Sequence, residues 1–146
     1  MRIAHRVHTA ASPAEVWAAL SDPSAWPAFD LFLGGMRGRV TQVAAGQRLM
    51  AVVRLSMLAI PVDVVEAVPG ERLVLVVHTA PGLREQLSFD LTPSVQRGCD
   101  IRVSVAVEGL FAPAAVLPVW LASGLTARVL AARTQRQARQ ARRSAA

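Results

Sequence analysis

Two polar residues lie at positions where alternating apolar residues predict the buried face of a strand. His5 has Ile3 and Val7 two positions away on either side, and Glu85 stands in the same relation to Leu87. Because alternate residues of a strand share one face, both side chains are expected to point inward. Burial raises the pKa of a carboxyl and favours a neutral imidazole, so the pair would suit general acid–base chemistry on an enolisable ligand. The alternative is a hydrogen-bonded core histidine and a glutamate that a bulge turns outward.

Bulky apolar side chains are available to line a ligand pocket beside these two residues. They come from predicted helices, strands and one loop, and are Trp26, Phe29, Met57, Leu87, Phe89, Leu117, Trp120 and Leu121. Core packing is the alternative to ligand contact for each of them. His78 precedes a turn at residues 80–82 and is expected either to touch a ligand or to end a strand. The set predicts an internal pocket for a small hydrophobic molecule.

Other catalytic and metal-binding chemistries lack the residues that they need. The three histidines do not have the spacing of metal ligands, and Cys99 is the only cysteine, which excludes a disulfide framework. The sequence contains no phosphate-binding glycine loop and no nucleophile elbow. It also contains no lysine, which excludes Schiff-base chemistry through that residue. We therefore expect neither a metal nor a cofactor.

The basic charge of the chain is concentrated at its C-terminal end. The 146 residues include 16 basic residues, all arginine, and 10 acidic residues, for a net charge of +6. Residues 1–127 are balanced, whereas residues 128–146 contain arginines and no acid. This distribution argues against a nucleic-acid-binding face on the folded body. A stripe of arginines predicts either a solvated helix end or a weak contact with an anionic membrane or acidic protein: Arg133, Arg136, Arg139 and Arg142.

Capping and turn residues divide the chain into helices and antiparallel strands. Residues 12–15, Ser-Pro-Ala-Glu, form a capping box with proline at the first helical position, so they predict a helix that ends near residue 20. Asp22 and Pro23 begin a second short helix in the same way, and residues 29–38 are expected to form a loop. Alternating apolar residues and short turns predict strands over residues 2–9, 39–44, 47–57, 61–68, 72–79, 83–91 and 100–108.

A long helical pattern follows the strands, from about residue 113 to the end of the chain. Residues 109–127 are 19 uncharged residues followed by arginines, which is also the pattern of a membrane span. Two prolines within this stretch, and the need of the sheet for a cover, favour a buried core helix instead. The stripe expected to face the sheet is Leu117, Trp120, Leu121, Leu125 (or Gly124) and Val129.

The first helix and one hairpin also have a family pattern. Two segments resemble the START-related helix-grip (SRPBCC, Bet v 1-like) superfamily. They are residues 11–23, ASPAEVWAALSDP, followed by Trp26 and Pro27, and residues 66–73, EAVPGERL. The resemblance is to its polyketide cyclase/dehydrase and lipid-transport branch. It implies an α+β helix-grip fold, in which a curved antiparallel sheet of about six to seven strands wraps around the long C-terminal helix. It also implies a hydrophobic pocket under that helix.

These observations favour one ligand-binding domain over residues 1–143, with residues 144–146 as a frayed tail. The expected function is binding of a small hydrophobic molecule, as a polyketide cyclase/dehydratase-like enzyme that uses His5 and Glu85. The alternatives are a non-catalytic carrier of a lipid or other hydrophobic ligand, and a protein that contacts a membrane or partner through its basic end. We expect a bacterial, cytoplasmic monomer or homodimer, because no secretory signal is visible and cysteine is scarce.

Overall fold

A curved sheet and one long helix organise the molecule. The computed structural model describes residues 1–39 and 41–146. Its elements are, in order, β1 (Arg2–Thr9), α1 (Pro13–Leu20), the 3₁₀ helix η1 (Pro23–Ala28), β2 (Leu33–Met36), β3 (Arg48–Val53), β4 (Ala59–Val68), β5 (Arg72–Ala80), β6 (Leu83–Pro93), β7 (Cys99–Glu108) and α2 (Ala112–Ser144). The described strands form one antiparallel sheet in the order β1-β7-β6-β5-β4-β3-β2. The predicted α+β helix-grip fold is therefore confirmed.

The two short helices begin where the sequence predicts. The Ser12 hydroxyl accepts a hydrogen bond from the Glu15 amide at 3.2 Å, and the Glu15 carboxylate accepts one from the Ser12 amide at 3.1 Å. This reciprocal pair satisfies two amides that the first turn leaves free. The Asp22 carboxylate caps η1 by accepting from the Ser24 amide at 3.0 Å. The 3₁₀ turn places Trp26 and Phe29 in the core beneath the sheet.

The segment between η1 and β3 differs from the prediction. Residues 33–36, expected in a loop, form the edge strand β2 beside β3. A Cβ on Gly34 would lie 3.3 Å from the Arg54 Cα, so glycine permits this close pairing. Residues 41–44, predicted as part of a strand over 39–44, are not in one, and residue 40 lies outside the described residues. The Val43 amide instead donates to the Ser21 carbonyl at 2.9 Å, which ties this segment to the turn after α1.

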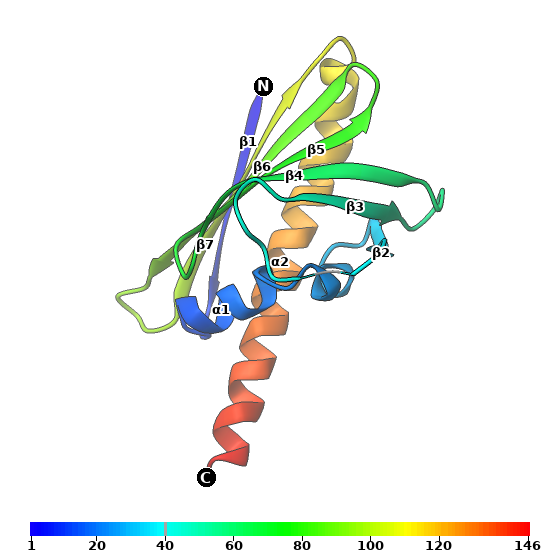
Figure 1. Cartoon of the computed structure of the whole chain (residues 1–146). Helices are drawn as coiled ribbons and strands as arrows, with labels where there is room; N and C mark the ends of the chain where they lie inside the picture. The colour runs from blue at the N-terminus through cyan, green and yellow to red at the C-terminus, as the bar shows by residue number, and fades with distance from the viewer. Residues whose placement is uncertain (40) are drawn as a thin grey trace.

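The long helix α2 rests on the end of the sheet formed by β1 and β7. Its C-terminal part continues past α1 and projects beyond the sheet (Figure 1). Small side chains make the closest approach, because a Cβ on Gly124 would already lie 3.1 Å from the His5 ring. The Thr134 hydroxyl lies 3.2 Å from that of Thr9, which fixes the helix against β1 farther along.

The predicted inward stripe of this helix is wrong for four bulky residues, whereas Val129 packs against the core and Gly124, the alternative to Leu125, lies against His5. Leu117, Trp120, Leu121 and Leu125 retain 66%, 48%, 52% and 46% of their exposure, and we call these four residues the outer face of α2. The buried positions are instead Ala112, Ser123, Thr126, Ala127, Leu130, Ala131, Thr134 and Ala138. Close packing around Gly124 admits mainly small side chains, and Leu130 is the one large side chain among these buried positions.

By length and composition alone, α2 is also apolar enough to cross a membrane, and 28% of its most apolar window is buried. The helix packs on the sheet through one side only. The expectation of a core helix is therefore met on that side, while no described part of the chain covers the outer face.

Candidate functional site

An apolar cavity of about 380 Å³ lies between the curved sheet and α2. This volume falls within the range of pockets that hold small organic molecules. Because α2 approaches the sheet closely only at β1 and β7, the strands that curve away from it leave this space open. The cavity wall from the strands consists of Val53, Ile60, Val62, Leu75, Val77, Thr79, Leu83, Glu85, Leu87, Phe89 and Val105.

The rest of the wall comes from α1, η1, β2 and α2. The N-terminal part contributes Leu20, Trp26, Phe29, Asp30, Phe32 and Leu33. The helix contributes Ala115, Pro118, Val119, Ala122, Ser123 and Thr126. Of the predicted ligand-contacting residues, the structure brings together Trp26, Phe29, Leu87 and Phe89 around this cavity, with Glu85 beside them.

The indole of Trp26 is held in a fixed orientation. Its Nε1 donates a buried hydrogen bond of 2.9 Å to the Leu20 carbonyl at the end of α1. A buried indole N–H without an acceptor would cost about 1–3 kcal/mol, so this bond both stabilises the fold and shapes the cavity. The apolar face of the ring remains available to a ligand.

The mostly apolar wall contains three polar side chains outside α2, which we call the acidic pole: Asp30, Thr79 and Glu85. Ser123 and Thr126 add two hydroxyl groups from α2. The Thr79 hydroxyl donates to Glu85 Oε1 at 3.0 Å, and the Phe32 amide donates to Asp30 Oδ1 at 2.9 Å. Among the described lining residues, the two carboxyls are the only ionisable groups.

The environment of the acidic pole raises the pKa of both of its carboxyls above the values that they would have in water. Burial raises the pKa of Asp30 above its ordinary value, against the opposing effect of backbone hydrogen bonds and of Arg54. Burial also raises the pKa of Glu85, and the nearby Asp30 charge acts in the same direction, while the bond from Thr79 opposes both. A raised pKa makes a carboxyl a better proton acceptor when it is ionised and keeps it protonated to a higher pH, which is the direction that general acid–base chemistry requires.

The other predicted catalytic residue, His5, is not among the residues that line the cavity. It faces α2, where its ring centroid lies 6.0 Å from that of Trp120 and its Cε1 lies under Gly124. Its Nε2 is buried and has no hydrogen-bond partner among the described residues. The parity argument placed this residue on the inner face, but α2 covers that position at β1 and separates it from Glu85.

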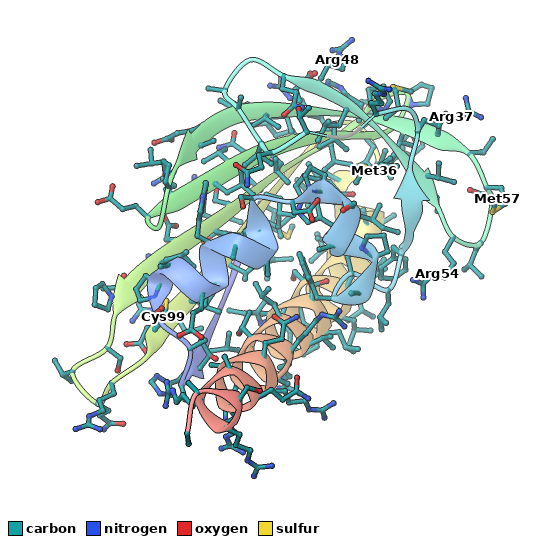
Figure 2. All side chains as sticks on the ribbon, turned by 60° about the horizontal axis from the view of Figure 1, so that its bottom comes forward. Met36, Arg37, Arg48, Arg54, Met57 and Cys99 are labelled. Atoms are coloured by element: carbon teal, nitrogen blue, oxygen red, sulfur yellow. The ribbon has the colours of Figure 1, made fainter. Side chains whose placement is uncertain are left out.

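Five predicted ligand contacts lie outside the cavity, and four of them are apolar. Met57 is 70% exposed at the loop between β3 and β4, and Figure 2 shows it at the outer edge of the molecule. Leu117, Trp120 and Leu121 belong to the outer face of α2. Their neighbours Pro118, Val119 and Ala122 line the cavity instead, because the helix is rotated from the predicted orientation.

His78 lies on the opposite face of β5, in a broad, open groove. Its Nε2 lies 2.9 Å from Asp63 Oδ2, and Arg48 holds the same carboxylate through two hydrogen bonds of 2.6 and 3.0 Å. The hydrogen bonds from Arg48, and to a lesser extent the one with His78, hold the pKa of Asp63 well below its usual range. The structure thus gives His78 a partner on the outer surface of the sheet.

Sequence reasoning missed Asp30, Thr79 and the small residues of α2. Asp30 follows η1 in a segment without periodicity, and no local pattern shows that it faces Glu85. Thr79 shares strand parity with Val77, so its inward position could have been predicted. The helix residues are alanine, serine, threonine and proline, which hydropathy does not single out.

Fold and cavity together define a helix-grip domain with an internal hydrophobic ligand site. The chain belongs to the family described as polyketide cyclase / dehydrase and lipid transport, whose model matches residues 1–146. A search of curated proteins found no match.

Solved structures of similar proteins support the same fold. A protein from Mesorhizobium loti has a TM-score of 0.73 at 18% identity, over 89% of this chain and 93% of its own. One from Nitrosospira multiformis has a TM-score of 0.74 at 11% identity, over 95% and 99%. One from Rhodobacter sphaeroides has a TM-score of 0.69 at 25% identity, over 90% and 89%.

Proposed function

We propose that this protein binds a small, predominantly apolar molecule in the cavity between its sheet and α2. The observation that supports the proposal is the cavity itself, with a wall of aliphatic and aromatic side chains and one acidic pole. Transfer of apolar surface from water into such a site contributes about 25 cal/mol per Å². The family description, which includes lipid transport, agrees with this class of ligand.

Displacement of a fluorescent apolar probe tests this proposal. The purified protein is expected to bind the neutral probe N-phenyl-1-naphthylamine with saturation, and 1-octanol is expected to displace it. Phe89→Ala should change the affinity, because Phe89 lines the cavity. Val95→Ala is the matched control, since Val95 is fully exposed on a distant turn. Equal affinity in both variants would contradict binding inside the cavity.

A second candidate function, acid–base catalysis of the cyclase/dehydratase kind, is favoured by the two carboxyls in the wall. Glu85 and Asp30 face the same cavity, and both prefer to hold a proton more than an exposed carboxyl does. In such a reaction, the carboxylate of one group would take a proton from the carbon beside a ketone. A protonated carboxyl would then donate to the carbonyl oxygen.

Hydrogen exchange on a simple ketone separates an enzyme from a carrier. The enzyme hypothesis predicts that the protein accelerates deuterium incorporation beside the carbonyl of 2-octanone in D₂O, as followed by NMR. Glu85→Gln should lose this acceleration and keep binding, because glutamine retains an acceptor for Thr79 but no exchangeable acid. Binding without accelerated exchange in the wild-type protein would favour the carrier.

The outer face of α2 favours contact with an anionic lipid surface. Leu117 and Leu121 lie on the same side of the helix as Arg128 and Arg139, since spacings of 4, 7 and 11 residues return to one face. The helix is therefore apolar along its first half and basic along its second half on that side. It has no acidic residue, so a second copy packed along it would meet arginines without partners. Each basic side chain near an anionic membrane contributes about 1 kcal/mol.

Vesicle cosedimentation tests the lipid contact. We expect binding to vesicles of phosphatidylcholine with phosphatidylserine, weaker binding at high salt, and little binding to phosphatidylcholine alone. Leu117→Gln with Leu121→Gln should reduce binding, as should Arg128→Gln with Arg139→Gln. Unchanged binding in both double variants would contradict the proposal. A dimer in native mass spectrometry that the leucine variant dissolves would instead identify a second copy as the occupant.

A further inference from the structure

The acidic pole contains carboxyl groups and no basic side chain, which limits the charge of the ligands that the cavity can hold. Among the described lining residues, Asp30 and Glu85 are ionisable and none is basic. The nearest cation that acts on Asp30 is Arg54, but its Nη2 donates to the carbonyls of Pro27 at 3.1 Å and Leu33 at 2.9 Å. Arg54 is therefore occupied in holding η1 and β2 together, outside the cavity wall.

The hydrogen bonds of the pole leave capacity for a ligand. Glu85 Oε1 accepts from Thr79, while no described residue donates to Glu85 Oε2. Asp30 Oδ1 is held by the Phe32 amide, which orients this carboxyl from the end of η1. Asp30 and Glu85 are half-buried. A partly desolvated carboxyl without a cationic partner is harder to ionise than an exposed one, so a ligand group that donates hydrogen bonds here would relieve that cost.

We propose that the acidic pole selects apolar ligands that end in a hydrogen-bond donor, above all a primary amine, and excludes ligands that end in a carboxylate. This inference rests on the proposed function, because the cavity is the binding site and the pole decides the ligand class. A carboxylate would bring a third anionic group into a low-dielectric space that contains no cation. An ammonium group would form charge-assisted hydrogen bonds with the same two carboxyls.

The raised pKa values of the two carboxyls agree with this selectivity. Partial burial stabilises the protonated form of both groups relative to an exposed carboxyl, and a bound ammonium would favour their ionised form. Amine affinity should therefore rise as the pH rises from the range in which the two carboxyls titrate toward neutrality.

Three probes with the same alkyl chain test the selectivity by titration calorimetry at pH 7: octylamine, 1-octanol and octanoate. We expect octylamine to bind most tightly and octanoate at least about tenfold more weakly, since one charge-assisted hydrogen bond is worth a factor of this order. In Asp30→Asn with Glu85→Gln, octylamine should lose about tenfold and octanoate should gain, while 1-octanol stays within about twofold. Asp63→Asn is the control, because Asp63 is an acid on the opposite face of the sheet and should leave all three affinities unchanged.

The outcomes separate this inference from the proposed function. If 1-octanol binds but octanoate binds as tightly as octylamine, the selectivity is wrong and the hydrophobic site stands. Unchanged preferences in the double variant would also overturn the role of the pole. If none of the three probes binds, both the proposed function and the inference fail.

Discussion

At the scale of single residues, the contact between His5 and Gly124 decides how closely α2 approaches the sheet. A Cβ at position 124 would lie 3.1 Å from His5 Cε1, which is tighter than ordinary van der Waals contact. The imidazole cannot easily withdraw, because Trp120 lies beside it. Glycine in a helix interior otherwise costs about 1 kcal/mol relative to alanine, so this position gives up helix propensity for close packing.

A double-mutant cycle measures this contact. Gly124→Ala is expected to lower the free energy of unfolding by about 1 kcal/mol, since overpacking outweighs the gain in helix propensity. In a His5→Ala background the same change should raise it by about 1 kcal/mol, because the clash is gone. Urea unfolding of the four proteins gives both values. An equal effect of Gly124→Ala in the two backgrounds would show that His5 does not limit the approach.

At the scale of elements, the rotation of α2 determines which of its leucines stabilise the protein. Leu130 is completely buried against the sheet, whereas Leu121 on the outer face keeps 52% of its exposure. The two residues lie nine positions apart in one helix, so they share propensity and differ in burial. The same rotation places Pro118, Val119 and Ala122 in the cavity wall.

Matched leucine truncations test this rotation. Leu130→Ala is expected to lower the free energy of unfolding by about 2–5 kcal/mol, because it leaves a void in the core. Leu121→Ala should change it by no more than about 0.5 kcal/mol. Chemical denaturation of both variants provides the comparison. A larger loss for Leu121→Ala would mean that the outer face is buried in solution, for instance against a second copy.

At the scale of the whole molecule, two sets of carboxyls give opposite contributions to the pH dependence of stability. Asp30 and Glu85 have raised pKa values, so their contribution is present below the unfolded-chain pKa and is lost as the pH rises through the folded value. Asp63 has a lowered pKa, so its contribution is present above the unfolded-chain pKa and is lost as the pH falls through the folded value.

Thermal or urea unfolding between about pH 2 and 7 separates the two sets, because the Asp63 contribution is lost only below the pKa of an unfolded-chain aspartate. Asp30→Asn with Glu85→Gln should be more stable than the wild-type protein at pH 7, and the difference should shrink toward pH 4. Asp63→Asn should be less stable than the wild-type protein at pH 7, and that loss should diminish in acid as Asp63 is protonated in the unfolded chain. Parallel pH profiles for wild type and the double variant would contradict the buried position of the acidic pole.

The sequence by itself determined the elements that local chemistry specifies. The capping box at Ser12 and Glu15, the alternation of β7 and the short turns predicted α1 and the antiparallel strands, and the family resemblance of residues 11–27 and 66–73 implied the helix-grip fold. Parity also predicted Glu85 correctly as a cavity residue, because the period of a strand leaves only two faces. Trp26, Phe29, Leu87 and Phe89 followed from their size and hydropathy within these elements.

Only the tertiary structure decided which side of α2 faces the sheet and which polar groups meet in the cavity. Residues 109–127 are uncharged all round, so their pattern contains no information about orientation, and the narrow approach at His5 selects Gly124 and its small neighbours. Asp30 and Glu85 are separated by more than fifty residues in the sequence, and only folding brings their charges close enough to interact. The arginine-rich end, and its helical alignment with Leu117 and Leu121, could be read from the sequence, but that this apolar side is exposed follows from packing. The orientation of a helix and the contacts between residues distant in sequence depend on long-range steric fit, which local propensity does not encode.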